Sequence, residues 1–319
     1  MGTASPGPQQ QLAPKRLMSE PAAGEAREAS AQPGDARMQD YDAEVFLLGA
    51  SELEMGNPVG AAALLERAIA INPDVAVYHV QLGRARALLR QFDDAVCAFR
   101  RAVALDPHSA EHHFQFGLAL SKSGDAGSAI VALDRAVALN PNHAAAYHHL
   151  GRSLQKSGDV SNAIANYERA VFFDPGLVDA HNDLGGAFVQ MGAVNAAVAC
   201  FRRAIELAPG LPEAHFNLGR VLVDRGEVFA AINEFRKVVA LEPAPGNWAE
   251  LGNALAAYGS DDESVEICHR LARDRAGLKR LGAELYREFL QLPLTDEPTF
   301  IRGIKDLLVR AWMERCRVV

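Results

Sequence analysis

A spacing of 34 residues recurs through most of this 319-residue chain. Prolines follow one another at this distance, and a glycine precedes each proline by 24 residues. The prolines are Pro73, Pro107, Pro141, Pro175, Pro209 and Pro243, and the glycines are Gly49, Gly83, Gly117, Gly151, Gly185 and Gly219. Six-fold register in separate columns indicates one structural unit repeated along the chain.

Each unit has the pattern of two helices. We number its positions from the residue 31 before its proline, so that positions 4, 7, 8 and 11 are largely apolar or small and share one face of a first helix. A turn follows, often with glycine, and a second helix then ends at the proline. The turn glycines are Gly56, Gly124, Gly158, Gly192 and Gly226. The sequence therefore predicts an all-α fold of stacked helical hairpins.

The second helix carries two small columns with a large residue between them. One column is alanine throughout, from Ala61 to Ala231, and the other runs from Ala68 to Ala204 before Val238 replaces it. Because a glycine inside a helix costs about 1 kcal/mol relative to alanine, the glycine column needs a reason, and we expect that reason to be close packing of helices. The large residues that would fill the remaining space are Leu65, Phe99, Leu133, Tyr167, Phe201 and Phe235.

Charge and composition exclude several partner classes. A net charge of -8 argues against nucleic acid or an anionic membrane as the main partner, because both select a basic face. We find no apolar run long enough to span a bilayer and no secretory signal, so membrane insertion is not expected. The four cysteines are far apart, which fits a reducing compartment, and we expect a cytoplasmic protein.

The histidine-rich stretch NPNHAAAYHHLG does not have metal-site spacing. His148 and His149 are adjacent, so they point about 100° apart on a helix, whereas zinc-binding helices use pairs four residues apart. His79, His113, His181 and His215 all fall at packing position 4. Catalytic motifs are also missing. We therefore expect structural or surface roles for the histidines, no metal or other cofactor, and no enzymatic activity.

Leu150-Gly151, Ala163, Tyr167, Ala170 and Pro175 are in the frame of the tetratricopeptide-repeat family, which the chain resembles. The resemblance covers residues 42–243 as six clear repeats, and a weaker seventh at 245–272 restarts one residue early with Trp248, Leu251 and Gly252. It implies an α-solenoid, a right-handed superhelix of helix pairs, with a concave groove lined by the first helices.

The two ends depart from the repeat. Residues 1–40 have no periodicity and their composition predicts a disordered tail, before a solenoid over residues 41–272. Residues 273–319 contain two helical patterns, which we interpret as a divergent C-terminal cap over the last apolar face. The alternative is a partner-binding or dimer-forming helix, so a homo-oligomer is a second prediction for this segment.

Positions 2, 6, 9 and 13 lie opposite the packing face and should line the groove. Position 6 is polar from the second repeat onward, which suits the backbone of an extended peptide. Repeats two to four are mostly basic here and repeats five to seven mostly acidic, so we expect the acidic part of a peptide to lie toward repeats two to four. The predicted partner-binding residues are Gln81, Arg84, Gln115, Lys122, His149, Arg152, Lys156, Asp183, Asn217, Arg220 and Glu250.

Two classes of function remain from the sequence. The first is a non-enzymatic scaffold or adaptor that binds a peptide or protein segment in the groove. The second is an accessory or targeting module of an enzyme, for example of a glycosyltransferase system, that acts through the C-terminal helices. Truncation of residues 273–319 would separate the two.

Overall fold

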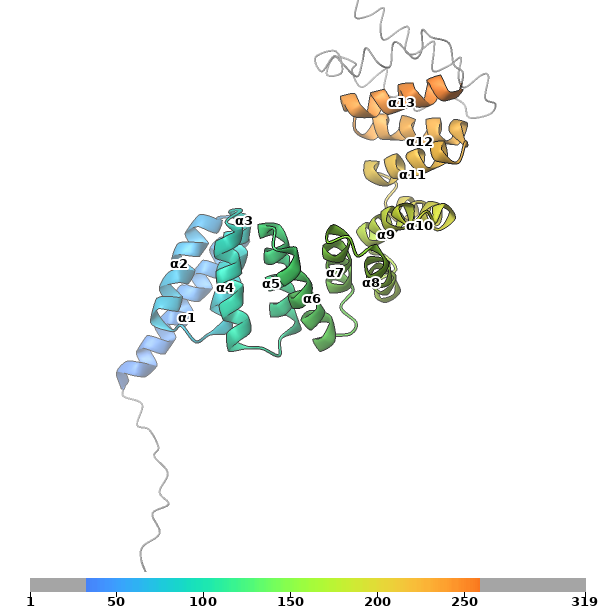
Figure 1. Cartoon of the computed structure of the whole chain (residues 1–319). Helices are drawn as coiled ribbons and strands as arrows, with labels where there is room; N and C mark the ends of the chain where they lie inside the picture. Colours follow the sequence, from blue (N-terminus) through green and yellow to red (C-terminus); the bar gives the residue numbers. More distant parts are fainter. Residues whose placement is uncertain (1–32, 259–319) are drawn as a thin grey trace, which may run out of the picture.

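The computed structural model describes residues 33–258, which form thirteen helices and no strand (Figure 1). The first helices of the hairpins are α1 (Pro33–Glu54), α3 (Ala76–Leu88), α5 (Ala110–Ser123), α7 (Ala144–Lys156), α9 (Val178–Gln190), α11 (Pro212–Asp224) and α13 (Pro245–Tyr258). The second helices are α2 (Pro58–Ile71), α4 (Phe92–Leu105), α6 (Ala126–Leu139), α8 (Val160–Phe173), α10 (Val194–Leu207) and α12 (Val228–Leu241).

The hairpins follow one another in chain order. Each first helix from α1 to α11 packs against the second helix of its own hairpin, and each from α3 to α13 packs against the second helix before it. Neighbouring first helices from α1 to α11 also meet. Figure 1 shows the helix axes turning along the row. The predicted all-α solenoid of helix pairs is therefore confirmed over residues 33–258. None of these helices has the length and apolar character needed to cross a bilayer.

The predicted ends need one correction. Helix α1 begins at Pro33, so residues 33–40 are helical although we expected them in the tail of residues 1–40. Proline is well suited to the first helical position, and helix-forming residues follow it despite the lack of an apolar period. Residues 1–32 of that tail, the second half of the seventh repeat and the predicted cap at 273–319 lie outside the described residues.

The glycine column lies directly against the large residues of the second helices. A Cβ atom built on Gly185 would be 2.6 Å from the ring of Phe201, and one on Gly151 would be 2.7 Å from the ring of Tyr167. Both rings are fully buried. The close approach expected from the sequence is therefore confirmed, and the packing leaves no room for a side chain at these glycines.

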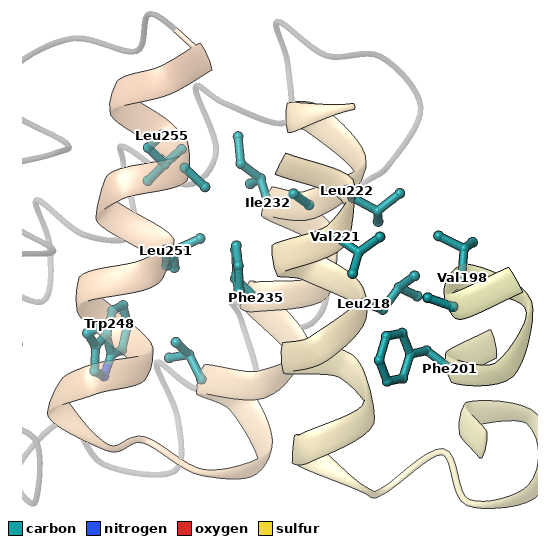
Figure 2. Close-up of a cluster of buried hydrophobic side chains, with 14 residues drawn as sticks. Val198, Phe201, Leu218, Val221, Leu222, Ile232, Phe235, Trp248, Leu251 and Leu255 are labelled. Carbon is teal, nitrogen blue, oxygen red and sulfur yellow. The ribbon is translucent and has the colours of Figure 1, made fainter. Parts of the chain in front are cut away.

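The same large residues also join neighbouring hairpins. Phe201 of α10 belongs to one buried cluster with Leu218 of α11, Phe235 of α12 and Leu251 of α13 (Figure 2). The side chain of one hairpin therefore packs in the same buried cluster as residues of the next, so neighbouring hairpins share apolar core although each hairpin is small. This is the usual way in which a solenoid buries apolar surface.

The turn inside each hairpin requires a left-handed residue. Gly56, Gly124, Gly158, Gly192 and Gly226, which the sequence placed in these turns, all have φ between 72° and 98°. The second hairpin has Arg90 at this place, with φ 60°. A residue with a side chain adopts this conformation at a cost of roughly 1 kcal/mol or more, so the α3–α4 turn is strained relative to the others.

Two adjacent glycines of α9 should respond in opposite ways to alanine. Gly185→Ala places a methyl against Phe201 and should lower stability by about 2 kcal/mol, whereas a Cβ on Gly186 would meet nothing within 4 Å. Gly186→Ala should therefore raise stability by up to about 1 kcal/mol through helix propensity alone. Thermal unfolding followed by circular dichroism tests this pair. Equal melting temperatures for the two variants would contradict the packing role of the column.

Candidate interaction surface on the first helices

The four histidines at position 4 tie each first helix to the turn before it. In each case Nε2 donates to the carbonyl oxygen of the repeat proline six residues earlier, at 2.8 Å from His79 to Pro73 and 3.0 Å from His215 to Pro209. His113 and His181 make the same bond at 3.1 Å. Their expected structural role is confirmed.

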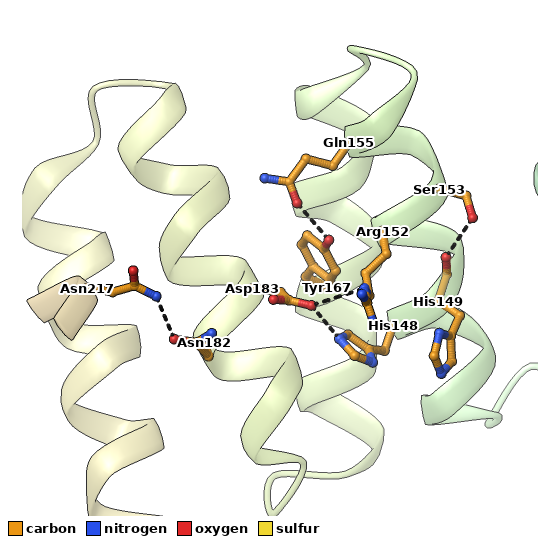
Figure 3. A network of polar contacts seen from close by, with 9 residues as sticks. All are labelled: His148, His149, Arg152, Ser153, Gln155, Tyr167, Asn182, Asp183 and Asn217. Carbon is orange, nitrogen blue, oxygen red and sulfur yellow. Dashed lines mark hydrogen bonds and ion pairs between the residues drawn. The ribbon is translucent and has the colours of Figure 1, made fainter. Parts of the chain in front are cut away.

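The three histidines of the NPNHAAAYHHLG stretch have three different environments. His143 caps α7, where its Nδ1 accepts a hydrogen bond from the Ala146 amide at 3.3 Å. His148 is buried and its Nε2 donates to Oδ2 of Asp183 on α9 at 2.8 Å (Figure 3). His149 is half-buried beside the ring of Phe114. No group of three or more potential metal ligands occurs among the described residues.

Polar contacts of one kind connect α7, α9 and α11. Position 5 of one repeat meets position 6 of the next: His148 binds Asp183, and Asn217 donates through Nδ2 to Oδ1 of Asn182 at 3.0 Å (Figure 3). The buried side chains His148 and Asn182 interrupt a column that is otherwise apolar, with Phe46, Val80, Phe114 and Phe216.

Our sequence reasoning missed this row because it assigned position 5 neither to packing nor to the groove. The signal was the change from apolar to polar residues in repeats four and five. A buried polar side chain needs a partner, and the structure shows that the partner belongs to the following repeat. These contacts hold neighbouring first helices in parallel register.

The predicted partner-binding residues all lie on first helices, but they are not one connected network. Arg84 donates to Gln81 at 3.1 Å, and Gln115 donates to Glu111 at 2.6 Å. Arg152 is 3.6 Å from Asp183, which it shares with His148. Within residues 33–258, no hydrogen bond or ion pair engages four predicted charged residues, which are Lys122, Lys156, Arg220 and Glu250.

Basic side chains surround His149. Burial lowers the pKa of His149 to about 4, and the neighbouring His148, Arg152 and Lys122 act in the same direction, whereas Asp183 acts against them. Lys122 of α5 and Arg152 of α7 therefore lie close enough to affect the same ring. The imidazole between them is neutral at pH 7, so it can accept or donate a hydrogen bond without adding charge.

The pKa of His149 has a consequence for stability. The folded state binds this proton only near pH 4, while an unfolded chain binds it near pH 6.5, so the unfolded chain takes up more protons between these values and stability falls as the pH is lowered through this window. Nitrogen-15 NMR titration of the histidine rings, with His149→Gln for assignment, should show that the His149 ring is still neutral at pH 5.5. In Arg152→Gln its pKa should rise, and a value near 6.5 in the unmodified protein would contradict the geometry.

Comparison with known protein families supports the repeat assignment. Models described as tetratricopeptide repeat and TPR repeat match residues 46–111 and 185–226, and a model described as anaphase-promoting complex, cyclosome, subunit 3 matches residues 88–170. The chain is a tetratricopeptide-repeat protein. Among curated proteins, none matches this tetratricopeptide-repeat chain significantly.

Solved structures with a similar fold include those of MamA, PilW and YrrB. MamA from Desulfovibrio magneticus RS-1 is 25% identical, over 53% of this chain and 96% of that one, with a TM-score of 0.51. PilW, described as a type IV pilus biogenesis factor, is 20% identical over 67% and 98%, with a TM-score of 0.59. YrrB, described as a TPR protein with an unusual peptide-binding site, is 19% identical over 61% and 97%, with a TM-score of 0.50. The likeness to PilW and YrrB is one of fold.

Proposed function

We propose that this protein is a non-enzymatic scaffold that binds a peptide or protein segment along its first helices. The observation that carries the proposal is the row of half-buried polar side chains at position 6 on successive first helices: Gln81, Gln115, His149, Asp183, Asn217 and Glu250. Side chains of this kind can bind the amide and carbonyl groups of an extended backbone, which need a partner wherever they leave water.

The likeness to other repeat proteins supports the general part of the proposal, which is that the chain binds a peptide or protein. The tetratricopeptide-repeat fold presents a series of parallel first helices, and YrrB is described as having a peptide-binding site. For this chain, the half-buried amide of Asn217 offers suitable chemistry. One hydrogen bond joins it to the buried Asn182, and the Asn217 amide has further donor and acceptor capacity for a ligand.

The exposed basic side chains on the first helices indicate where the acidic part of the ligand binds. Lys122, Arg152 and Lys156 are exposed on α5 and α7, and no acidic side chain neutralises Lys122 or Lys156 within the described part of the chain. Arg152 is paired with Asp183 at 3.6 Å, but its side chain is exposed and can also bind a ligand carboxylate. We place the acidic part of the ligand here, in repeats three and four.

Peptide display on the full-length protein tests this function. Peptides that bind the unmodified chain should be enriched in Asp and Glu, and Arg152→Glu/Lys156→Glu should weaken the best of them about tenfold, the change expected when contacts worth about 1.4 kcal/mol are lost. A matched control, Arg135→Glu/Arg202→Glu, reverses two exposed arginines on the second helices α6 and α10. Equal loss in both variants, or no loss in either, would contradict the placement on the first helices.

A further inference from the structure

On the surface formed by the first helices, acidic residues lie mostly toward the start of the helices and basic residues toward their ends. The two signs are therefore separated along the helix axes, which is across the width of this surface. Because each hairpin reverses the chain, all first helices run in the same direction, and the contacts between positions 5 and 6 keep α7, α9 and α11 in register. Equal positions therefore form rows along the solenoid. The charged residues at positions 2 and 6 of the first helices, named here the acidic edge, are Glu111, Asp179, Asp183, Glu213 and Glu250.

The opposite side of the same surface is mostly basic. The cations at positions 9 and 13, named here the basic edge, are Arg84, Lys122, Arg152, Lys156 and Arg220. Positions 2 and 6 carry no lysine or arginine in the described repeats, and positions 9 and 13 carry only two acids, Glu54 and Asp224. The two edges therefore have opposite signs over most of the surface.

The helix dipole explains only part of this separation. Acidic residues are favoured in the first turn of a helix and basic residues in the last, but the effect falls off within one turn. Positions 6 and 9 lie in the middle of these helices, where Asp183, Arg152 and Arg220 are found. The ion pair between Arg152 and Asp183 accounts for two of these charges. The charge of Arg220 needs another account, and a ligand with two differently charged sides supplies one.

The spacing of the edges fits one extended chain. The centres of the two edges are seven residues apart along a helix, which corresponds to about 10 Å at 1.5 Å per residue. In an extended peptide successive side chains point to opposite sides, so acidic and basic residues in alternation would point to opposite edges. The backbone would then lie over the middle of the surface, where Gly186 of α9 leaves open space.

We propose that the first helices bind an extended peptide in which acidic and basic side chains alternate, with the acidic ones toward the basic edge. The inference rests on the proposed function, because it concerns the ligand of the same surface. It keeps peptide binding but replaces the placement of one acidic part at repeats three and four by an orientation about the long axis of the peptide. A gradient of charge along the solenoid would instead favour separate acidic and basic blocks.

Two peptides of equal composition distinguish these arrangements. One alternates Glu and Lys over about twelve residues, which span about 40 Å when extended, and the other has all its Glu residues before its Lys residues. The alternating peptide does not favour a helix, because like charges recur four residues apart. Fluorescence anisotropy with the full-length protein at low salt should show about tenfold tighter binding of the alternating peptide, or about 1.4 kcal/mol.

Exchanging the edges supplies a second test. Lys156→Glu/Arg220→Glu should weaken binding of the alternating peptide severalfold, and so should Asp179→Lys/Glu213→Lys; all four residues are exposed. The protein with all four changes should recover part of the binding, because the peptide can turn over about its own axis at repeats four to six, where the four reversed charges lie. Circular dichroism confirms that each variant is folded, and the comparison of peptides on the unmodified protein does not depend on any variant.

Each outcome decides between the proposals. Equal binding of the two peptides, tighter binding of the block peptide, or no recovery in the fourfold variant would overturn the alternating ligand while the proposed peptide-binding function stands. If neither peptide binds, and a peptide of alternating Gly and Glu does not bind either, both the ligand and the function are rejected.

Discussion

Contact between a glycine of the first helix and a large side chain of the second is the interaction on which the rest of this structure depends. Gly83, Gly117, Gly151, Gly185 and Gly219 each lie so close to that side chain that a Cβ would be 2.9 Å or less from it. The buried side chain then reaches the next hairpin as well. A single contact type therefore sets both the geometry inside a repeat and the step from one repeat to the next.

Repetition of this step determines what the surface can do. Since every hairpin uses the same repeat positions for packing, the remaining positions of the first helices form rows along the solenoid. Local interactions then modify these rows: His148 and Asn182 bind the following repeat, Arg152 shares Asp183, and His149 stays neutral between basic neighbours. The surface offered to a partner is thus set by packing first and by a few side-chain contacts second.

The periodic columns made the fold predictable from the sequence. The recurring glycines, alanines and prolines identified the hairpins, the turns between their helices and the close packing of the two helices, because each depends on local residues that recur from repeat to repeat. The start of α1 at Pro33 was not predictable in the same way, since residues 33–40 have no apolar period. Arg90 was also missed as a left-handed residue, because the glycine that marks this turn elsewhere is replaced.

The candidate surface was harder to predict from the sequence than the fold. Helical periodicity placed the predicted residues on the first helices, but it could not show that Asp183 is bound by His148 or that Lys122 affects His149. Such contacts depend on the offset between neighbouring first helices. This offset places position 5 of one repeat beside position 6 of the next. The rows of charge across the surface became visible only once that register was known.

Proton NMR measures the central contact directly. Nuclear Overhauser effects between the Hα protons of a column glycine and the ring sixteen residues later should be strong for Gly83 with Phe99, Gly151 with Tyr167, Gly185 with Phe201 and Gly219 with Phe235. The ring currents should also shift these glycine resonances away from their usual values. Four such pairs would support a repeated interlock of glycine and aromatic ring, and the lack of these cross-peaks in a folded, helical protein would contradict it.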